Sequence, residues 1–241
     1  MLEIMKQKLY WNDSEATAIE KAQIAFVQQG RAPDAHVVKE LIQGQHATGG
    51  FEGFWTSGQP AIDPTCDRLA NLQMLGLLHF PQARAAADFL QRNWTGTPEA
   101  CELLGHLPPW LAPSEHSTLY LKANSAFHLS LQQREVHPEV LQDLQAAGLN
   151  LGFWQTFWLV ASLQHRLGNF VLFEQISAHM ENQLSSFEEE DLIWLCEAYF
   201  AAGVPAEHGL VRAAFSLLLA KHPGQTRSSR VYRLFLLSHQ A

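Results

Sequence analysis

A helical spacing of apolar residues recurs along almost the whole chain and limits the folds that it can adopt. Segments rich in Leu and Ala carry apolar residues at i, i+3, i+4 and i+7, and no run of alternating β-branched residues interrupts them. Prolines stand near the expected helix starts, at Pro33, Pro81, Pro138 and Pro205, and glycines stand near the ends. The sequence therefore predicts an all-α protein.

The expected helices are of two alternating kinds. One kind mixes polar and apolar positions, as a helix with one solvent-exposed face does, over 34–46, 81–93, 137–147, 170–184 and 205–221. The other kind begins polar and becomes apolar or aromatic, over 63–79, 115–133, 150–168, 187–203 and 226–240. Further helices are expected over 14–29 and 98–106. Hairpins that recur about every 35 to 50 residues predict stacked helix pairs, either in an open solenoid or in a closed ring.

Composition and charge restrict the class of protein. The 241 residues are 47% hydrophobic and 17% charged, which is typical of a globular chain, and no linker divides them, so we expect one domain over 1–241. A net charge of −8 without a basic patch argues against nucleic acid as a partner. The absence of a long uninterrupted apolar stretch predicts no membrane span. Cys66, Cys101 and Cys196 lack C-x-x-C spacing, which fits a reducing compartment and a cytoplasmic protein.

One segment, 45–76, carries a more specific pattern. A helix ends at Gln45, the turn Gly49-Gly50-Phe51 follows, and a helix led by Pro64-Thr65 runs to Leu75-Gly76. The segment resembles a repeat of the terpenoid cyclase and protein prenyltransferase family, as found in prenyltransferase β subunits and squalene-hopene-type cyclases.

The glycine and aromatic residues of this turn have a physical explanation. Gly49 and Gly50 allow positive φ and close backbone approach, and the aromatic residues Phe51, Phe54 and Trp55 can fill the gap between neighbouring hairpins. Asp63 and Pro64 are then expected at the N-cap and first position of the next helix.

The resemblance implies an α/α toroid of about five to six helical hairpins, closed or incomplete, with polar groups at one mouth of a central cavity. Carried over to this sequence, it implies catalytic roles for Asp63, Asp67, His116 and Tyr120. The expected substrate-binding residues are Trp55, Trp154, Phe157, Trp158, Trp194, Arg227 and Arg230. Most of the aromatic residues could equally fill the core, and the arginines could equally belong to a solvated or ion-paired helix.

The resemblance also implies a possible zinc site. Protein prenyltransferases hold zinc with an Asp and a Cys at the start of one inner helix and a His from a later one, and Asp63, Cys66 and His116 are similar to that set. The spacing departs from the family, with Asp-x-x-Cys in place of Asp-x-Cys. The alternative is a capping Asp63, a buried inert Cys66 and a surface His116.

The acidic motifs of the family are missing, since neither Asp-x-Asp-Asp nor Asp-Asp-x-x-Asp occurs. Asp63 and Asp67 lie one helical turn apart and could share a proton or a cation, with the pKa of one raised by the charge of the other. Such a pair is also common on ordinary helices.

Three functions fit these observations. The first is an enzyme that cyclises or rearranges an apolar isoprenoid or polyene in a central aromatic-lined cavity. The second is a non-catalytic helical scaffold that binds a protein or peptide partner. The third is a carbohydrate-active enzyme of the α/α type, with paired carboxylates and stacking tryptophans.

Overall fold

The computed structural model describes residues 10–11, 16–53, 55, 58–94, 108, 111–221 and 226–239, and these form a mostly helical protein. Eleven α-helices lie within the described part of the chain. They are α1 (Ala18–Gln29), α2 (Ala35–Ile42), α3 (Ile62–Gln73), α4 (Pro81–Asn93), α6 (Glu115–Leu131), α7 (Pro138–Ala147), α8 (Trp154–Arg166), α9 (Phe170–Glu181), α10 (Glu189–Ala201), α11 (Gly209–Lys221) and α12 (Ser229–Leu237). Short strand pairs join β1 (Tyr10–Trp11) to β4 (Thr226–Arg227) and β2 (Phe51–Glu52) to β3 (Pro60–Ala61).

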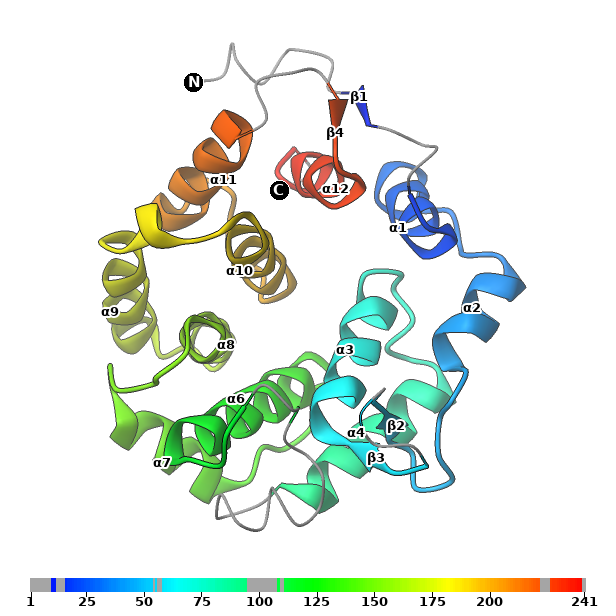
Figure 1. Cartoon of the computed structure of the whole chain (residues 1–241), viewed down its shortest axis with the longest axis horizontal. Helices are drawn as coiled ribbons and strands as arrows, with labels where there is room; N and C mark the ends of the chain where they lie inside the picture. The colour runs from blue at the N-terminus through cyan, green and yellow to red at the C-terminus, as the bar shows by residue number, and fades with distance from the viewer. Residues whose placement is uncertain are drawn as a thin grey trace.

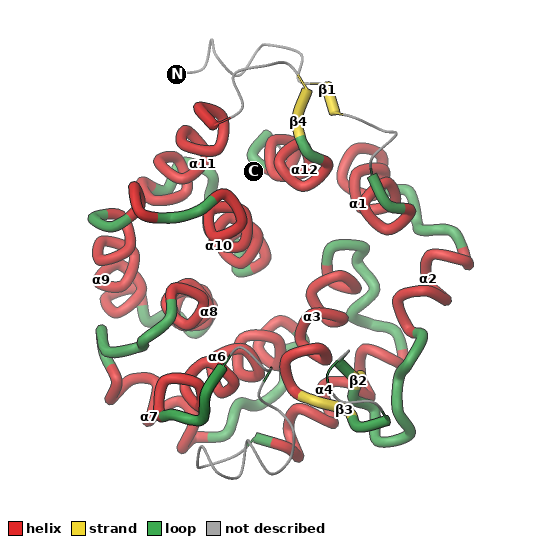
Figure 2. The backbone as a smooth tube through the Cα atoms, viewed as in Figure 1, coloured by secondary structure: helices red, strands yellow, loops and turns green. Residues whose placement is uncertain are grey.

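The helices follow one another around the middle of the molecule. Figure 1 shows α3, α6, α8, α10 and α12 nearest to the middle, with α2, α4, α7, α9 and α11 outside them. Figure 2 shows how little strand structure accompanies these helices. The helices near the middle are those whose sequences begin polar and become apolar, and α6 and α8 are buried along most of their length.

The helices near the middle run in the same direction. At the C-terminal ends of α6 and α8, the Arg166 guanidinium donates to the Ser130 carbonyl at 2.7 Å. At the ends of α8 and α10, His165 Nδ1 lies 3.3 Å from the Ala202 carbonyl. Because α3, α6, α8 and α10 are each followed by an outer helix along which the chain returns, their N-terminal ends also gather on one side of the molecule.

The all-α prediction is confirmed, and the predicted helices agree with the structure apart from shortened ends. The helix expected over 98–106 lies outside the described residues. The predicted start of α3 is wrong: the helix begins at Ile62 after Ala61, so Asp63 is not its N-cap and Pro64 is its third residue, not its first. The Asp63 carboxylate instead accepts hydrogen bonds from α6, which leaves it unavailable for capping.

The glycine turn after α2 is as tight as its sequence predicts. Gly49 has φ +97°, and a Cβ there would lie 2.1 Å from the carbonyl oxygen of Ala85 in α4. The Gln45 side chain donates to the carbonyls of Gly49 and Gln82, each at 2.8 Å, which ties the turn to α4. Phe51 then lies fully inside the core, whereas Phe54 lies outside the described residues.

The first and last described helices meet. Helix α1 packs against α12, and β1 pairs in parallel with β4, so the described helices return to their starting point (Figure 1). We call this contact between α1 and α12 the seam. Among the described residues, no helix is both long enough and apolar enough to cross a membrane.

Candidate functional site

A cavity of about 870 Å³ lies between the helices nearest to the middle. Its walls come from α3, α6, α8 and α10, together with the loop after β2. Residues that line it include Trp55, Asp63, Cys66, Asp67, Gln73, Tyr120, Asn124, Phe127, His128, Leu131, Gln155, Trp158, Leu159, Trp194, Glu197 and Ala201.

The lining of the cavity mixes acidic, neutral polar and apolar side chains. Asp63 of α3 is hydrogen-bonded to Tyr120 and Asn124 of α6, and Asp67 follows one turn later; we call these four residues the polar end. Elsewhere the apolar side chains of Ala70, Phe127, Leu131, Leu159 and Ala201 line the cavity together with the polar side chains of Gln73, His128 and Glu197. A molecule in the cavity would therefore meet carboxyl groups, neutral polar groups and hydrocarbon.

Asp63 lies at the centre of a hydrogen-bonded group at the polar end. The Tyr120 hydroxyl donates a short hydrogen bond to Asp63 Oδ1, and Asn124 Nδ2 donates to the same oxygen at 3.2 Å. Burial raises the pKa of Asp63, the hydrogen bond from Tyr120 opposes that shift, and the charge of Asp67 adds to it. The Asp63 carboxyl group therefore holds its proton to higher pH than an ordinary aspartate does.

Asp67 lies one turn further along α3, where its side chain is exposed to the cavity yet deep within the molecule. Its pKa is also raised, chiefly by burial, against the opposing charges of Arg68 and Arg230. The predicted acid pair is therefore present in one cavity. Burial, more than mutual repulsion, raises the two pKa values.

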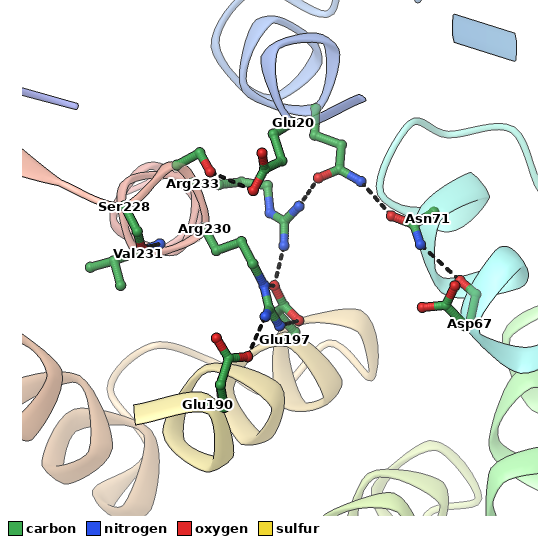
Figure 3. A network of polar contacts seen from close by, with 11 residues as sticks. Glu20, Asp67, Asn71, Glu190, Glu197, Ser228, Arg230, Val231 and Arg233 are labelled. Carbon is green, nitrogen blue, oxygen red and sulfur yellow. Dashed lines mark hydrogen bonds and ion pairs between the residues drawn. The ribbon is translucent and has the colours of Figure 1, made fainter. Parts of the chain in front are cut away.

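A second polar cluster lies where α10, α12 and α1 meet (Figure 3). Arg230 binds Glu197 at 2.7 Å and Glu190 at 2.5 Å, and Arg233 binds Glu197 through a short ion pair. Arg233 is 3% exposed and also donates to Gln23, whose amide donates to Asn71 of α3 at 3.0 Å. Arg230 is thus ion-paired, which agrees with the alternative that the sequence left open for it.

The tryptophans divide between the cavity and the core. Trp55, Trp158 and Trp194 line the cavity, and the rings of Trp158 and Trp194 lie 6.4 Å apart. Trp154 and Phe157 are not among the residues that line the cavity. The ring of Phe157 stacks on that of His179 at 5.0 Å, and the ring of Trp154 lies tilted 5.9 Å from it.

Other predicted site residues are placed away from the cavity. His116 Nε2 lies 3.3 Å from Asn150 Oδ1, and its ring packs beside Gly152, so it does not line the cavity. The side chain of Arg227 lies outside the described residues. Arg230 is not among the residues that line the cavity, although its guanidinium carbon lies 6.0 Å from the centre of the Trp194 ring, which does line it.

The residues of the predicted zinc site do not come together. Cys66 is buried beside Asp63, and burial raises the pKa of its thiol, whereas His116 bonds to Asn150. In the described ranges, no three His, Cys, Asp or Glu side chains are close enough to share a metal ion. Zinc stays a prediction that this arrangement does not support.

Several cavity residues were not predicted from the sequence, notably Asn124, His128, Gln155 and Glu197. A signal for two of them exists, because Tyr120, Asn124 and His128 follow one another at i, i+4 and i+8 on a helix that is otherwise apolar or small on that face.

Comparison with protein-family models, with curated proteins and with solved structures gives no match.

Proposed function

We propose that the chain is an α/α toroid enzyme that binds an isoprenoid or polyene in the central cavity and cyclises or isomerises it by proton transfer. The contact of α1 with α12 and the two layers of helices support a closed toroid over an open solenoid. A cavity with an aromatic lining favours an enzyme over a scaffold that binds a peptide on its surface.

The carboxyl pair at the polar end carries the proposal. Asp63 has a raised pKa, lies in the cavity wall and is oriented by Tyr120 and Asn124. In the proposed step, the Asp63 carboxyl group gives its proton to an alkene carbon of the substrate, and the carbocation later loses a proton to a base such as Asp67. Trp158 and Trp194 would stabilise the cationic intermediate with their π faces.

Binding is tested first with farnesol and geranylgeraniol. Because Trp158 and Trp194 line the cavity, either compound should change the tryptophan fluorescence of the protein in a saturable way. The variant Trp158→Phe should reduce this change. A lack of saturable binding for both compounds would contradict the proposal.

Proton transfer is tested by incubation with squalene and with geranylgeraniol in D₂O. The products should carry deuterium at the protonated carbon, as seen by mass spectrometry. Asp63→Asn should abolish incorporation, whereas Asp34→Asn, at a side chain that is 61% exposed, should leave it unchanged. Incorporation that persists in Asp63→Asn would exclude Asp63 as the acid.

A second candidate is a carbohydrate-active enzyme. The observation in its favour is that the carboxyl groups of Asp63 and Asp67 share the cavity with three tryptophans, a combination that glycan-processing enzymes use. Saturable binding of a linear oligosaccharide such as cellohexaose, without binding of farnesol, would favour this candidate.

A further inference from the structure

Asn124 is a buried polar side chain in the wall of the central cavity. It is 7% exposed and lies one turn after Tyr120 on α6. Its amide nitrogen donates to Asp63 Oδ1 at 3.2 Å and to the Tyr120 hydroxyl oxygen at 3.4 Å. Both contacts require a donor, because the Tyr120 hydroxyl gives its own proton to Asp63. The Asn124 amide is therefore oriented with its nitrogen toward Asp63 and its carbonyl oxygen away from it.

The carbonyl oxygen of Asn124 is an acceptor that the described residues leave unused. Oδ1 accepts no hydrogen bond from any of them, yet it does not belong to the fully buried side-chain atoms that lack a partner. The oxygen therefore keeps accessible surface, and since Asn124 lines the cavity, a molecule there can reach it. Unused acceptors on side chains as buried as this one are rare in folded proteins, and a bound donor is one explanation.

The polar end as a whole offers acceptors to a ligand. The hydroxyl proton of Tyr120 and the amide protons of Asn124 are already directed at Asp63 and at the Tyr120 oxygen. The Asp67 carboxylate accepts no hydrogen bond from a described residue, and the Asp63 carboxyl group holds the proton of the proposed reaction. A ligand group that satisfies Asn124 Oδ1 must therefore be a hydrogen-bond donor.

The charges around the polar end decide which donor fits. An ammonium group would stabilise the ionised form of Asp63 and so remove the proton that the proposed reaction uses. A phosphate group would meet two carboxyl groups, and the cation that the lining offers it is Arg68, next to Asp67 on α3. A neutral hydroxyl group donates one hydrogen bond and leaves both carboxyl groups in their charge states.

We infer that the substrate is an isoprenoid alcohol whose hydroxyl group donates a hydrogen bond to Asn124 Oδ1. This inference rests on the proposed function and names the head group of its substrate. A hydrocarbon or an ether would leave Asn124 Oδ1 unsatisfied, whereas an alcohol satisfies it. Asn124 is then a residue that determines substrate specificity, in addition to its contact with Asp63.

Three probes that share one hydrocarbon chain test the inference: farnesol, farnesyl methyl ether and farnesyl monophosphate. The hydroxyl group of farnesol donates, the ether oxygen only accepts, and the phosphate is anionic. We expect farnesol to bind roughly tenfold more tightly than the ether, because the ether leaves a buried acceptor unpaired. The monophosphate should also bind more weakly than farnesol. Binding is followed by the fluorescence of Trp158 and Trp194, which line the cavity.

Variants separate the hydrogen bond from the added size of the ether. In Asn124→Leu, which lacks the acceptor, the preference for farnesol over the ether should disappear. Both probes meet the same loss of the Asn124 amide nitrogen, so the ratio of their affinities isolates the carbonyl oxygen. Asn182→Leu, at an exposed position at the end of α9, is the matched control and should keep the preference. In wild-type protein with ¹³C-labelled asparagine, the side-chain carbonyl signal of Asn124 should shift with farnesol and hardly at all with the ether.

The outcomes are distinct. Equal affinities for farnesol and its methyl ether in the wild-type protein, with an unchanged Asn124 signal, would overturn the inference and leave the proposed function standing, since an isoprenoid still binds. Tighter binding of the monophosphate than of farnesol would overturn it in favour of an anionic head group. No binding of any of the three probes would overturn both. If Asn124→Leu does not fold, the NMR comparison on the wild-type protein still decides the question.

Discussion

The two acidic clusters beside the central cavity differ in how their charges are compensated. At the seam, Glu197 is held between Arg230 and Arg233, and Glu20 accepts hydrogen bonds from Ser229 and Thr17. On α3, beside the seam, Asp63 and Asp67 have no ion pair with a described residue, and Asp63 is hydrogen-bonded only to neutral groups. The charges at the seam therefore join helices, whereas the Asp63 cluster holds the uncompensated carboxyl groups on which the proposed proton transfer depends.

The pKa values of the carboxyl groups in the two clusters shift in opposite directions. Although burial acts to raise the pKa of Glu20, hydrogen bonds from Ser229 and Thr17 outweigh it and lower that pKa. Burial raises the pKa values of Asp63 and Asp67, and their neighbours do not reverse the shift. The partners that surround a carboxyl group thus distinguish those that join helices here from those that we propose to react.

The largest effect is expected for Arg233→Met. The change leaves Gln23 without its donor and removes one of the two cations that hold Glu197, so the free energy of unfolding should fall by about 3 kcal/mol. Urea unfolding measures this. Arg31→Met is the matched control at a side chain that is 64% exposed, with an expected change below about 0.5 kcal/mol. Equal stability of the two variants would show that the seam does not depend on the ion pair.

The next prediction concerns Asp63→Asn, at a carboxyl group that has no ion pair with a described residue. The pKa of Asp63 is higher in the folded protein than in the unfolded chain. The stability that the protonated Asp63 side chain contributes is therefore complete below its pKa in the unfolded chain, and it is lost as the pH rises through its pKa in the folded protein. The variant should therefore be more stable than the wild-type protein at pH 7, by about 1 to 2 kcal/mol, and the two should converge near pH 3.5. Unfolding curves from pH 3.5 to 8 measure the difference. A variant that is less stable at pH 7 would contradict the raised pKa.

Tyr120→Phe is expected to have a smaller effect. It removes the hydroxyl group that donates to Asp63, so the free energy of unfolding should fall by about 1 kcal/mol. Since that hydrogen bond lowers the pKa of Asp63, the pKa should rise further in the variant. NMR titration of the Asp63 carboxyl carbon measures this shift, and Tyr232→Phe, at the seam, should leave it unchanged. An unchanged Asp63 titration would exclude the coupling.

The smallest effect is expected for Glu20→Gln at the partly exposed edge of the seam. The pKa of Glu20 is lowered in the folded protein. The stability that the ionised Glu20 contributes is therefore present above the ordinary pKa of glutamate and is lost as the pH falls through the pKa of Glu20 in the folded protein. The variant should lose about 0.5 kcal/mol at pH 7 and approach the wild-type protein at low pH. A pH dependence with the same sign as that of Asp63→Asn would remove the contrast between the two clusters.

The sequence predicted the helices better than the site. Apolar periodicity and the positions of proline and glycine located the described helices, with α4 matched at both ends, since these signals are local. Helix ends were less accurate because capping depends on neighbours. At α3, the expected cap Asp63 is engaged by Tyr120, 57 residues further along the chain.

The site was predicted in part, for a physical reason. Asp63, Asp67 and Tyr120 were expected together and do line one cavity, as do Trp55, Trp158 and Trp194. The pairing of Glu197 with Arg233 joins residues 36 positions apart on different helices, and no local pattern marks it. Which face of α8 meets the cavity likewise depends on tertiary packing, so Trp154 could not be distinguished from Trp158.

The seam also has a consequence for the order of folding. Glu20 and Ser229 are separated by 209 positions, so α1 cannot complete its contacts until α12 has been synthesised. Hairpins such as α8 with α9 involve neighbours in sequence and can form early, whereas the seam closes a long loop and forms late. Amide hydrogens of α1 and α12 should therefore exchange with solvent sooner than those of α6 and α8, and the molecule should open first at the seam.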